Sequence, residues 1–318
     1  MSLNRNNPDN WKQDISKSVD FYNQWFLKFA PKTFRETRIQ TTKEVEIALI
    51  KTNNLLDLSP ATLIESPGIL SMLRMSTCPP IARDRLIGLS YVSPNVVKSL
   101  ELNKLPKKMS NENLFQELTK ICEILKKLFD PDIFTWLDNG KIPDKIEIER
   151  VSTIIADRLC GSIADPIVRN AQEKRQFLTM QSWLEKRNYR RIKNNEVKDF
   201  RELPNGTFDF HFNIPVKINR QKPVNIPVDI IIKPHTSGKS NLPILIEAKS
   251  AGDFTNVNKR RKEEAVKMSQ LRATYGDEIQ YLLLLCGYFD SGYLGYEAAE
   301  GIDWVWEHSM DDFSKIGL

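Results

Sequence analysis

The sequence predicts a mixed α/β protein, α+β overall, with a helical N-terminal domain and a C-terminal domain built on strands. Two observations lead to this fold class. Up to about residue 160, apolar residues recur at the spacing of amphipathic helices, and no convincing strand is found. Beyond that point, alternating and continuous apolar runs typical of strands dominate. Because Gly161 ends a helical pattern, we expect domains over residues 1–160 and 161–318.

Composition indicates a globular, cytoplasmic protein. Of its 318 residues 41% are hydrophobic, and the net charge of +5 permits nucleic-acid binding without demonstrating it. The four cysteines are widely spaced and form no zinc-binding pattern, which favours reduced thiols in a cytosolic protein. The N-terminus lacks the apolar core of a signal peptide, and no segment has the roughly 18 apolar residues that cross a bilayer.

The N-terminal helices are predicted from apolar stripes and caps. Residues 11–58 are expected to be largely helical. Ser59 and Ser66 each stand directly before a proline, so each is expected to cap a further helix. Residues 111–129 and 146–160 carry apolar residues at the same three- and four-residue spacing. A helical layer is therefore expected over this half of the chain.

A further long helix is expected from Asp165-Pro166 to about Asn188, because Asp-Pro is typical of a helix start. Its inward stripe includes Phe177 and Met180, and stepping back four residues from Phe177 reaches Glu173. A carboxylate in line with an apolar stripe is costly to bury without a partner. Glu173 is therefore expected either to turn to solvent or to face a cation in the interior.

A first group of candidate phosphate contacts follows the rigid step Pro79-Pro80. Arg83 and Arg85 lie just beyond it, with Asp84 between them as a residue that can hold one arginine in place. The alternative is a surface salt bridge at a helix start.

A second basic group covers residues 186–193, with Tyr189 among five positive charges. It includes Arg190 and Arg191. The sequence leaves two interpretations open, a solvated helix end and a contact with the phosphate backbone of a nucleic acid.

The strand predicted around residues 208–212 alternates with a period of two. Phe208, Phe210 and Phe212 are expected to share one buried face, with Asp209 on the other.

Two later apolar runs carry the residues with the clearest chemistry. The run over residues 244–250 ends with Glu247 and Lys249, which share one face because residues two apart in a strand point the same way. The run over residues 227–232 contains a single carboxylate, Asp229. Each run has the length and character of a buried strand.

A hairpin between these strands, with its turn in residues 235–241, would bring Asp229 and Glu247 to one spot. Two carboxylates there can bind a hard cation beside Lys249, which is a site for cutting a phosphodiester. Asp209 is a rival for the aspartate, but a whole strand separates it from Glu247. The hairpin argument therefore favours Asp229.

The segment after Lys249 leads into another helix. Asn258 is suited to cap it, yet residues 259–262 place four cations in its first turn, where the helix dipole disfavours them. A polyanion docked at this point would compensate, so we expect DNA contact here rather than a merely solvated charge run.

The chain closes with a buried strand over residues 279–287, a short helix near residues 293–300 and a strand over residues 303–306. The C-terminal order is then helix, three strands, helix, strand, helix, strand. Together with Asp229 and the tripeptide Glu247-Ala248-Lys249, this order resembles the PD-(D/E)XK nuclease fold, a restriction-endonuclease-like core with a mixed central sheet flanked by helices. In the motif of this fold the proline directly precedes the aspartate, whereas here Val228 stands between Pro227 and Asp229.

Two longer stretches make the resemblance more specific. Residues 78–89, CPPIARDRLIGL, and residues 247–261, EAKSAGDFTNVNKRR, are similar to the XamI-type family of type II restriction endonucleases. This resemblance implies a Mg²⁺-dependent homodimer that cuts both strands of DNA at a short palindromic site, paired with a cognate DNA methyltransferase. It also implies that the helical domain supports DNA binding or dimerisation. Glu173 matches the further acid that this fold often takes from the helix before its three strands.

The resemblance assigns roles to the site residues. Asp229, Glu247 and the carbonyl of Ala248 would hold Mg²⁺, and Lys249 would orient the attacking water and stabilise charge on the phosphate. A repair or recombination nuclease of the same fold and a non-cleaving sequence-specific DNA-binding protein are the alternatives. The candidate DNA contacts are Asn256, Asn258, Lys259, Arg260, Arg261, Lys262, Arg83, Arg85, Arg190 and Arg191.

Overall fold

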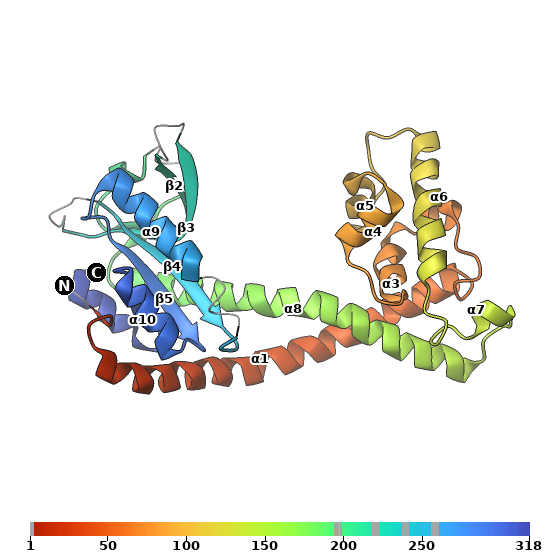
Figure 1. The fold of residues 1–318 in the computed structure, drawn as a ribbon, viewed down its shortest axis with the longest axis horizontal. Helices are drawn as coiled ribbons and strands as arrows, with labels where there is room; N and C mark the ends of the chain where they lie inside the picture. The colour runs from red at the N-terminus through yellow and green to blue at the C-terminus, as the bar shows by residue number, and fades with distance from the viewer. Residues whose placement is uncertain (1–2, 194–196, 198, 218–222, 237–241, 256–260) are drawn as a thin grey trace. The chain divides into compact units, whose positions relative to one another are not determined.

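The computed structural model describes residues 3–193, 197, 199–217, 223–236, 242–255 and 261–318. The chain forms two compact units, one of Ala30–Val168 and one that combines Met1–Phe29 with Arg169–Leu318. Two long helices, α1 (Pro8–Lys51) and α8 (Lys145–Glu185), each contribute residues to both units (Figure 1). The first unit is called here the helical unit and the second the sheet unit.

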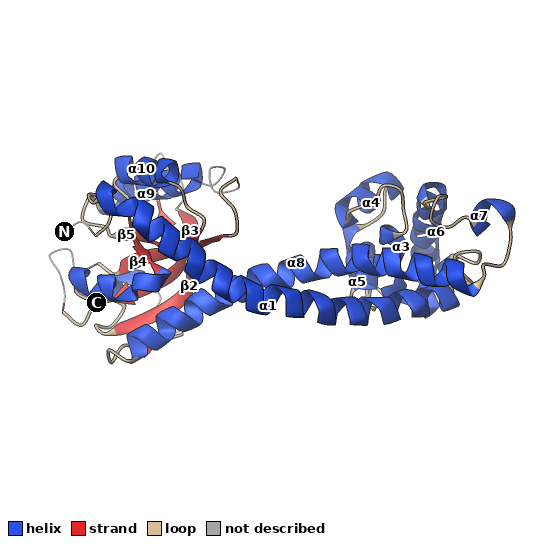
Figure 2. Cartoon of the chain, turned by 90° about the horizontal axis from the view of Figure 1, so that it is seen from below, coloured by secondary structure: helices blue, strands red, loops and turns tan. Residues whose placement is uncertain are grey.

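The helical unit consists of helices and loops (Figure 2). Besides parts of α1 and α8, it contains α2 (Pro60–Glu65), η1 (Pro67–Ile69), α3 (Leu70–Met75), α4 (Arg83–Ser90), α5 (Pro94–Glu101), α6 (Asn111–Leu128) and α7 (Trp136–Asn139). The predicted cap is confirmed at Ser59, whose hydroxyl accepts a hydrogen bond from the Thr62 N–H at 3.3 Å, but Ser66 makes no side-chain cap bond.

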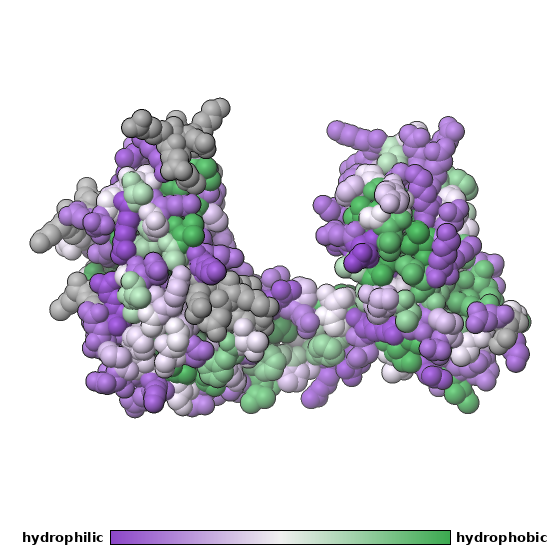
Figure 3. Space-filling model, viewed as in Figure 1, coloured by the Kyte–Doolittle hydropathy of each residue, from purple (hydrophilic) through white to green (hydrophobic). Residues whose placement is uncertain are grey.

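The core of the helical unit lies between α6, the adjoining parts of α1 and α8, and the short helices α2 to α5. Leu118, Ile121 and Leu125 of α6 are fully buried, as expected from their helical spacing. They join the cluster that holds Leu49 of α1 and Ile155 of α8. Figure 3 shows further hydrophobic residues at the surface of this unit near α3 and α4, bordered by hydrophilic ones.

Helix α8 corrects two predictions. It runs without a break through Gly161, and Pro166 lies inside it rather than at its first turn. A glycine costs a helix about 1 kcal/mol and an internal proline about 3 kcal/mol. Burial of an apolar side chain contributes about 1.5–3 kcal/mol, so packing of Val151, Ile155 and Leu159 outweighs these costs. Residue 160 therefore lies within a helix, and the separate functional roles of the two predicted domains stay a prediction.

The sheet unit contains a six-stranded mixed sheet in the order β1-β2-β3-β4-β5-β6. The pairs β2–β3 and β3–β4 are antiparallel, and the pairs β1–β2, β4–β5 and β5–β6 are parallel. The predicted order of helix, three strands, helix, strand, helix, strand is found with three additions, the two-residue strand β1 and η2 before the three strands and η4 after the last one. The elements are β1 (Arg190–Arg191), η2 (Phe200–Glu202), β2 (Thr207–Val216), β3 (Val224–Lys233), β4 (Ile244–Ala251), α9 (Arg261–Tyr275), β5 (Tyr281–Gly287), α10 (Ser291–Ala299), β6 (Asp303–Trp306) and η4 (Glu307–Ile316).

Each face of this sheet is covered by helices (Figures 1 and 2). On one face, called the α9 layer, Leu245 and Leu283 pack with Leu271 of α9 and Leu294 of α10. On the other face, called the α8 layer, the buried residues include Ile246, Leu284, Met180 and Leu184 of α8, and Phe313 of η4. Because both faces are covered, the central strands are apolar on both sides, which explains the continuous apolar run of β5.

The three phenylalanines of β2 do not share one face, so that prediction is wrong. All three are buried, but Phe208 and Phe210 belong to the α8 layer whereas Phe212 belongs to the α9 layer. His211 between them has a φ of 56°, outside the extended region. A strand with one such residue loses its strict alternation, so the next side chain reaches the opposite face.

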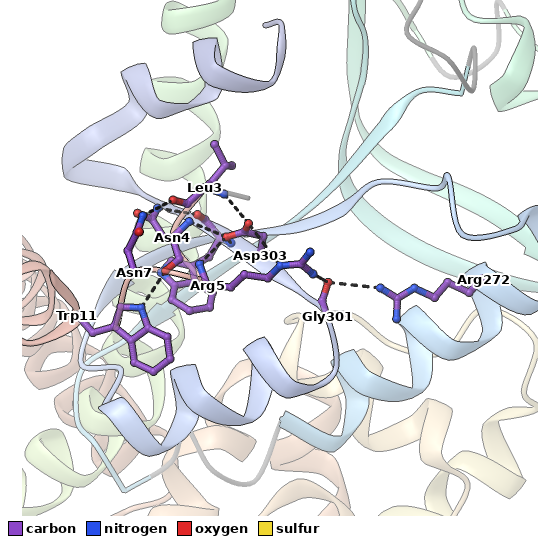
Figure 4. Close-up of polar contacts among 9 residues, drawn as sticks. Leu3, Asn4, Arg5, Asn7, Trp11, Arg272, Gly301 and Asp303 are labelled. Atoms are coloured by element: carbon purple, nitrogen blue, oxygen red, sulfur yellow. Dashed lines mark hydrogen bonds and ion pairs between the residues drawn. The ribbon is translucent and has the colours of Figure 1, made fainter. Parts of the chain in front are cut away.

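The N-terminal segment is fastened to the start of β6 (Figure 4). The Asp303 carboxylate accepts hydrogen bonds from the backbone N–H groups of Leu3 at 2.6 Å, Asn4 at 2.9 Å and Arg5 at 3.0 Å. The Trp11 indole N–H donates to the Asn4 carbonyl at 2.9 Å. These bonds hold the start of α1 in the sheet unit. Among the described residues, no helix has the length and apolar character needed to cross a membrane.

Candidate active site

The predicted antiparallel pairing of β3 and β4 is confirmed, and residues 237–241 of the predicted turn lie outside the described residues. Ile230 pairs with Ile246 and Ile231 with Leu245, a register that sets Asp229 opposite Glu247. The Asp229 carboxylate accepts a hydrogen bond from the backbone N–H of Ala248 at 2.9 Å. The aspartate is therefore held against β4 beside the glutamate, as expected from the sequence.

Glu247 and Lys249 point into the α9 layer, where two residues of α9 meet them. The Lys249 ammonium lies 3.3 Å from the Glu247 carboxylate and 2.6 Å from that of Glu264. The Lys267 ammonium lies 2.8 Å from the same Glu247 oxygen, Oε1. Glu264 and Lys267 are three residues apart, so one turn of α9 presents both to β4.

Burial strengthens the interactions between these charged groups, because little water screens them. Glu247 is 7% exposed and Glu264 is fully buried. Burial alone would lower the pKa of Lys249, but the carboxylates of Glu247 and Glu264 raise it above its usual value. The Lys249 ammonium is thus held between two carboxylates that favour its charged form.

The pKa of Asp229 is raised to about 6, first by burial and then by the neighbouring Glu247 carboxylate. The Ala248 N–H and the two lysines oppose this rise without cancelling it. Two acids so close favour one cation between them.

A further acid lies behind Lys249. Glu297 of α10 is fully buried, and burial followed by the charge of Glu264 raises its pKa to about 8. Burial and the nearby Glu297 likewise raise the pKa of Tyr293. At neutral pH Glu297 therefore favours its protonated form, unlike a solvent-exposed glutamate.

The donor set fits a Mg²⁺ ion that takes its remaining ligands from water and substrate. Asp229 and Glu247 offer carboxylate oxygens, and Glu247 Oε2 is buried without a hydrogen-bond partner among the described residues. Mg²⁺ is commonly bound by one or two carboxylates together with waters and phosphate oxygens. Within the described ranges, no three His, Cys, Asp or Glu residues form a complete metal cage.

Glu173 takes the solvent-facing alternative. It is exposed on α8, whereas its neighbours Gln172 and Gln176 are buried. The Gln176 amide donates to the carbonyl of Lys249 at 3.3 Å. Among the described contacts of Asp229, Glu247 and Lys249, none involves Glu173.

The third carboxylate of the cluster is instead Glu264. Sequence reasoning missed it, although it lies four residues before Met268 in the apolar stripe of α9, the same signal that drew attention to Glu173. Lys267 gave no such signal.

Asp209 has a different partner from Asp229. It is buried on β2, and its carboxylate lies 3.2 Å from Nε of Arg191, whose guanidinium sits over the Phe210 ring at 4.7 Å. Asp209 is thus paired with Arg191, which is itself one of the candidate DNA contacts.

The other candidate DNA contacts are mostly exposed. Arg85, Arg190 and Lys262 are exposed, and Arg83 pairs with Glu101 rather than with Asp84. The candidates outside the described residues are Asn256, Asn258, Lys259, Arg260 and the side chain of Arg261.

Comparison with known proteins identifies the family of this chain. The sequence model of the XamI restriction endonuclease family matches residues 53–306. The chain belongs to this family. Over 315 residues, 99% of each chain, it is 50% identical to the type II restriction enzyme SalI of Streptomyces albus G. A solved structure, protein VC1899 from Vibrio cholerae, covers 91% of this chain and 56% of its own at 10% identity, and its TM-score of 0.29 supports no argument about fold.

Proposed function

We propose that this restriction enzyme, a type II site-specific deoxyribonuclease, makes Mg²⁺-dependent double-strand cuts at a short palindromic DNA sequence. The observation that carries the proposal is the meeting of Asp229, Glu247 and Lys249 on two adjacent strands. Two oxygen ligands for a metal ion, beside an ammonium, form a site that can hydrolyse a phosphodiester. The family and the full-length relative support the same reaction class.

In this proposal Asp229 and Glu247 hold the metal, with the Ala248 carbonyl as a further ligand. The bound ion would polarise the phosphate and lower the pKa of a water. Lys249 orients that water and stabilises the negative charge that builds on the phosphate. Glu264 keeps the Lys249 ammonium in place, because the ion pair is buried and only 2.6 Å long.

The proposed core is of the PD-(D/E)XK type, supported by the strand order and by the position of the three motif residues on β3 and β4. The exposed Arg85, Arg190 and Lys262 are proposed to contact DNA phosphates. Arg83 and Arg191 join them if DNA replaces their present carboxylate partners, while Glu173 is proposed only as a residue outside the metal site.

A palindromic site implies a homodimer with two-fold symmetry, since each protomer then reads one half of the sequence. A cytoplasmic enzyme that cuts unmodified DNA implies a cognate methyltransferase to protect the host. Both partners belong to the proposal.

Digestion of a plasmid by the full chain tests it. Discrete fragments with constant ends are expected in Mg²⁺ and none in EDTA. Lys249→Ala and Glu247→Ala should lose cleavage while retaining most specific DNA binding, and Glu263→Gln, an exposed neighbour on α9, should cut normally. Full activity of either active-site variant would refute the assignment, and cutting only from DNA ends would indicate a repair nuclease.

A further inference from the structure

Two ammonium groups converge on one oxygen of the proposed metal ligand. Lys267 Nζ lies 2.8 Å from Glu247 Oε1, closer than Lys249 Nζ at 3.3 Å. Lys267 also donates to the carbonyl of Pro227 at 3.2 Å. It thus bridges β3 and β4 at the place where a metal ligand needs its oxygen free.

The two lysines are held differently. Lys249 has a second carboxylate, Glu264, at 2.6 Å and keeps it if Glu247 turns to a metal. In the part of the chain that the structure describes, the ion pair of Lys267 is with Glu247 alone. Lys267 is therefore the ammonium that can leave, on a flexible four-carbon side chain.

The formal charges of the cluster also favour the departure of one ammonium group when a metal binds. Three carboxylates, of Asp229, Glu247 and Glu264, meet two ammonium groups, of Lys249 and Lys267, in this cluster, so its formal charge is −1. A divalent ion would leave one positive charge in excess. An anion from the substrate, a phosphate of the DNA, restores the balance.

We propose that Lys267 is the counter-ion that a divalent metal displaces from Glu247, and that its freed ammonium then pairs with a phosphate of the bound DNA. The inference rests on the proposed function, because it takes Asp229 and Glu247 as the metal ligands. Lys267 of α9 would then lower the affinity of the free protein for the metal and raise the affinity of the metal-bound protein for DNA.

Lys267→Met separates these two effects, since they have opposite signs. Without DNA, the variant should bind Mn²⁺ on the order of tenfold more tightly than the unaltered protein, because one ammonium fewer competes for Glu247. With Ca²⁺ present, it should bind DNA several-fold more weakly, because one phosphate contact is lost. A merely structural lysine would weaken both or change neither.

Mn²⁺ binding to the full chain is measured by electron paramagnetic resonance of the free ion. DNA binding is measured by fluorescence anisotropy of a duplex centred on the mapped cleavage position. Lys267→Arg keeps the charge and should leave both affinities within about threefold of the unaltered protein. Lys315→Met removes an equal charge from an exposed side chain that pairs with Asp312, and should change neither. Lys267→Gln, with a shorter polar side chain, repeats the test if the Met variant does not fold.

The outcomes are distinct. If Lys267→Met binds Mn²⁺ no more tightly than the unaltered protein, or binds DNA equally well, the inference is overturned. The proposed metal site still stands in that case, provided that Glu247→Gln abolishes Mn²⁺ binding. If Mn²⁺ binding persists in Glu247→Gln, the proposed metal site fails, and the role of Lys267 fails with it.

Discussion

The carboxylate of Glu264 on α9 lies 2.6 Å from the Lys249 ammonium, nearer than Glu247, which shares strand β4 with that lysine at 3.3 Å. A helix that follows the motif in the chain thus supplies the closer partner of its lysine. Because Glu264 is fully buried, water screens the pair little, and the attraction between the two charged groups is strong. The proposed water-orienting residue is therefore positioned by α9 as much as by its own strand.

Glu264→Gln is expected to slow single-turnover cleavage by about 10–100-fold, because residues that orient an active-site group typically have effects of this size. DNA affinity should change less than about threefold, since Glu264 is buried behind Lys249. Glu263→Gln, one residue earlier and exposed, is the matched control. An unaltered cleavage rate in Glu264→Gln would show that Lys249 needs no second anchor.

Asp229→Asn and Asp209→Asn decide between the two aspartates. Asp229→Asn should abolish cleavage by removing a metal ligand. Asp209→Asn should keep cleavage and lose about 1–3 kcal/mol of stability, because it breaks the ion pair of a buried carboxylate with Arg191. Plasmid digestion and urea unfolding of both variants provide the measurement. Loss of cleavage in a stably folded Asp209→Asn would reverse the assignment.

Glu297 should make stability depend on pH. Its pKa in the folded protein is about 8, above that of an unfolded glutamate, so between these values the folded state holds a proton that the unfolded state has lost. The free energy of unfolding therefore falls as pH rises, by at most about 1.4 kcal/mol per pH unit from this residue, and levels off above the folded pKa. Glu297→Gln lacks this contribution. The free energy of unfolding of the variant minus that of the unaltered protein should therefore increase between pH 5 and pH 8. Urea unfolding of both proteins across that range is the measurement, and a constant difference would contradict the raised pKa.

Asp303→Ala should release the N-terminal segment. The substitution removes the acceptor of four backbone N–H groups, at Leu3, Asn4, Arg5 and Trp304, at an expected cost of about 2–4 kcal/mol. Limited proteolysis should then cut near the N-terminus, and urea unfolding should give the loss. Asp312→Ala, an acid of η4 that pairs with Lys315, is the control and should resist proteolysis.

The site hairpin was predictable because its information is local. Two apolar strands of fixed side-chain alternation, each with one well-placed acid, leave few ways to pair, and the register found sets Asp229 opposite Glu247. The family was likewise identified from residues 78–89 and 247–261, and the family match confirms it.

The rest depended on contacts between distant segments. Gly161 and Pro166 break a helix by local preference, but buried residues of α8 override that preference. Glu173 is exposed and Gln176 is buried because of the rotation of α8 about its own axis. The apolar residues of this part of the sequence do not determine that rotation, since polar residues lie among them. Glu264 carried a readable signal, whereas the position of Lys267 follows only from how α9 docks on the sheet.

Two ion pairs join α9 to β4. In one the acid, Glu247, lies on the strand and the base, Lys267, on the helix. In the other the base, Lys249, lies on the strand and the acid, Glu264, on the helix. If α9 slid by one turn along β4, Lys267 would come to face Lys249, so like charges would meet. The same four side chains that surround the proposed chemistry therefore also select a single docking position for the helix as the chain folds.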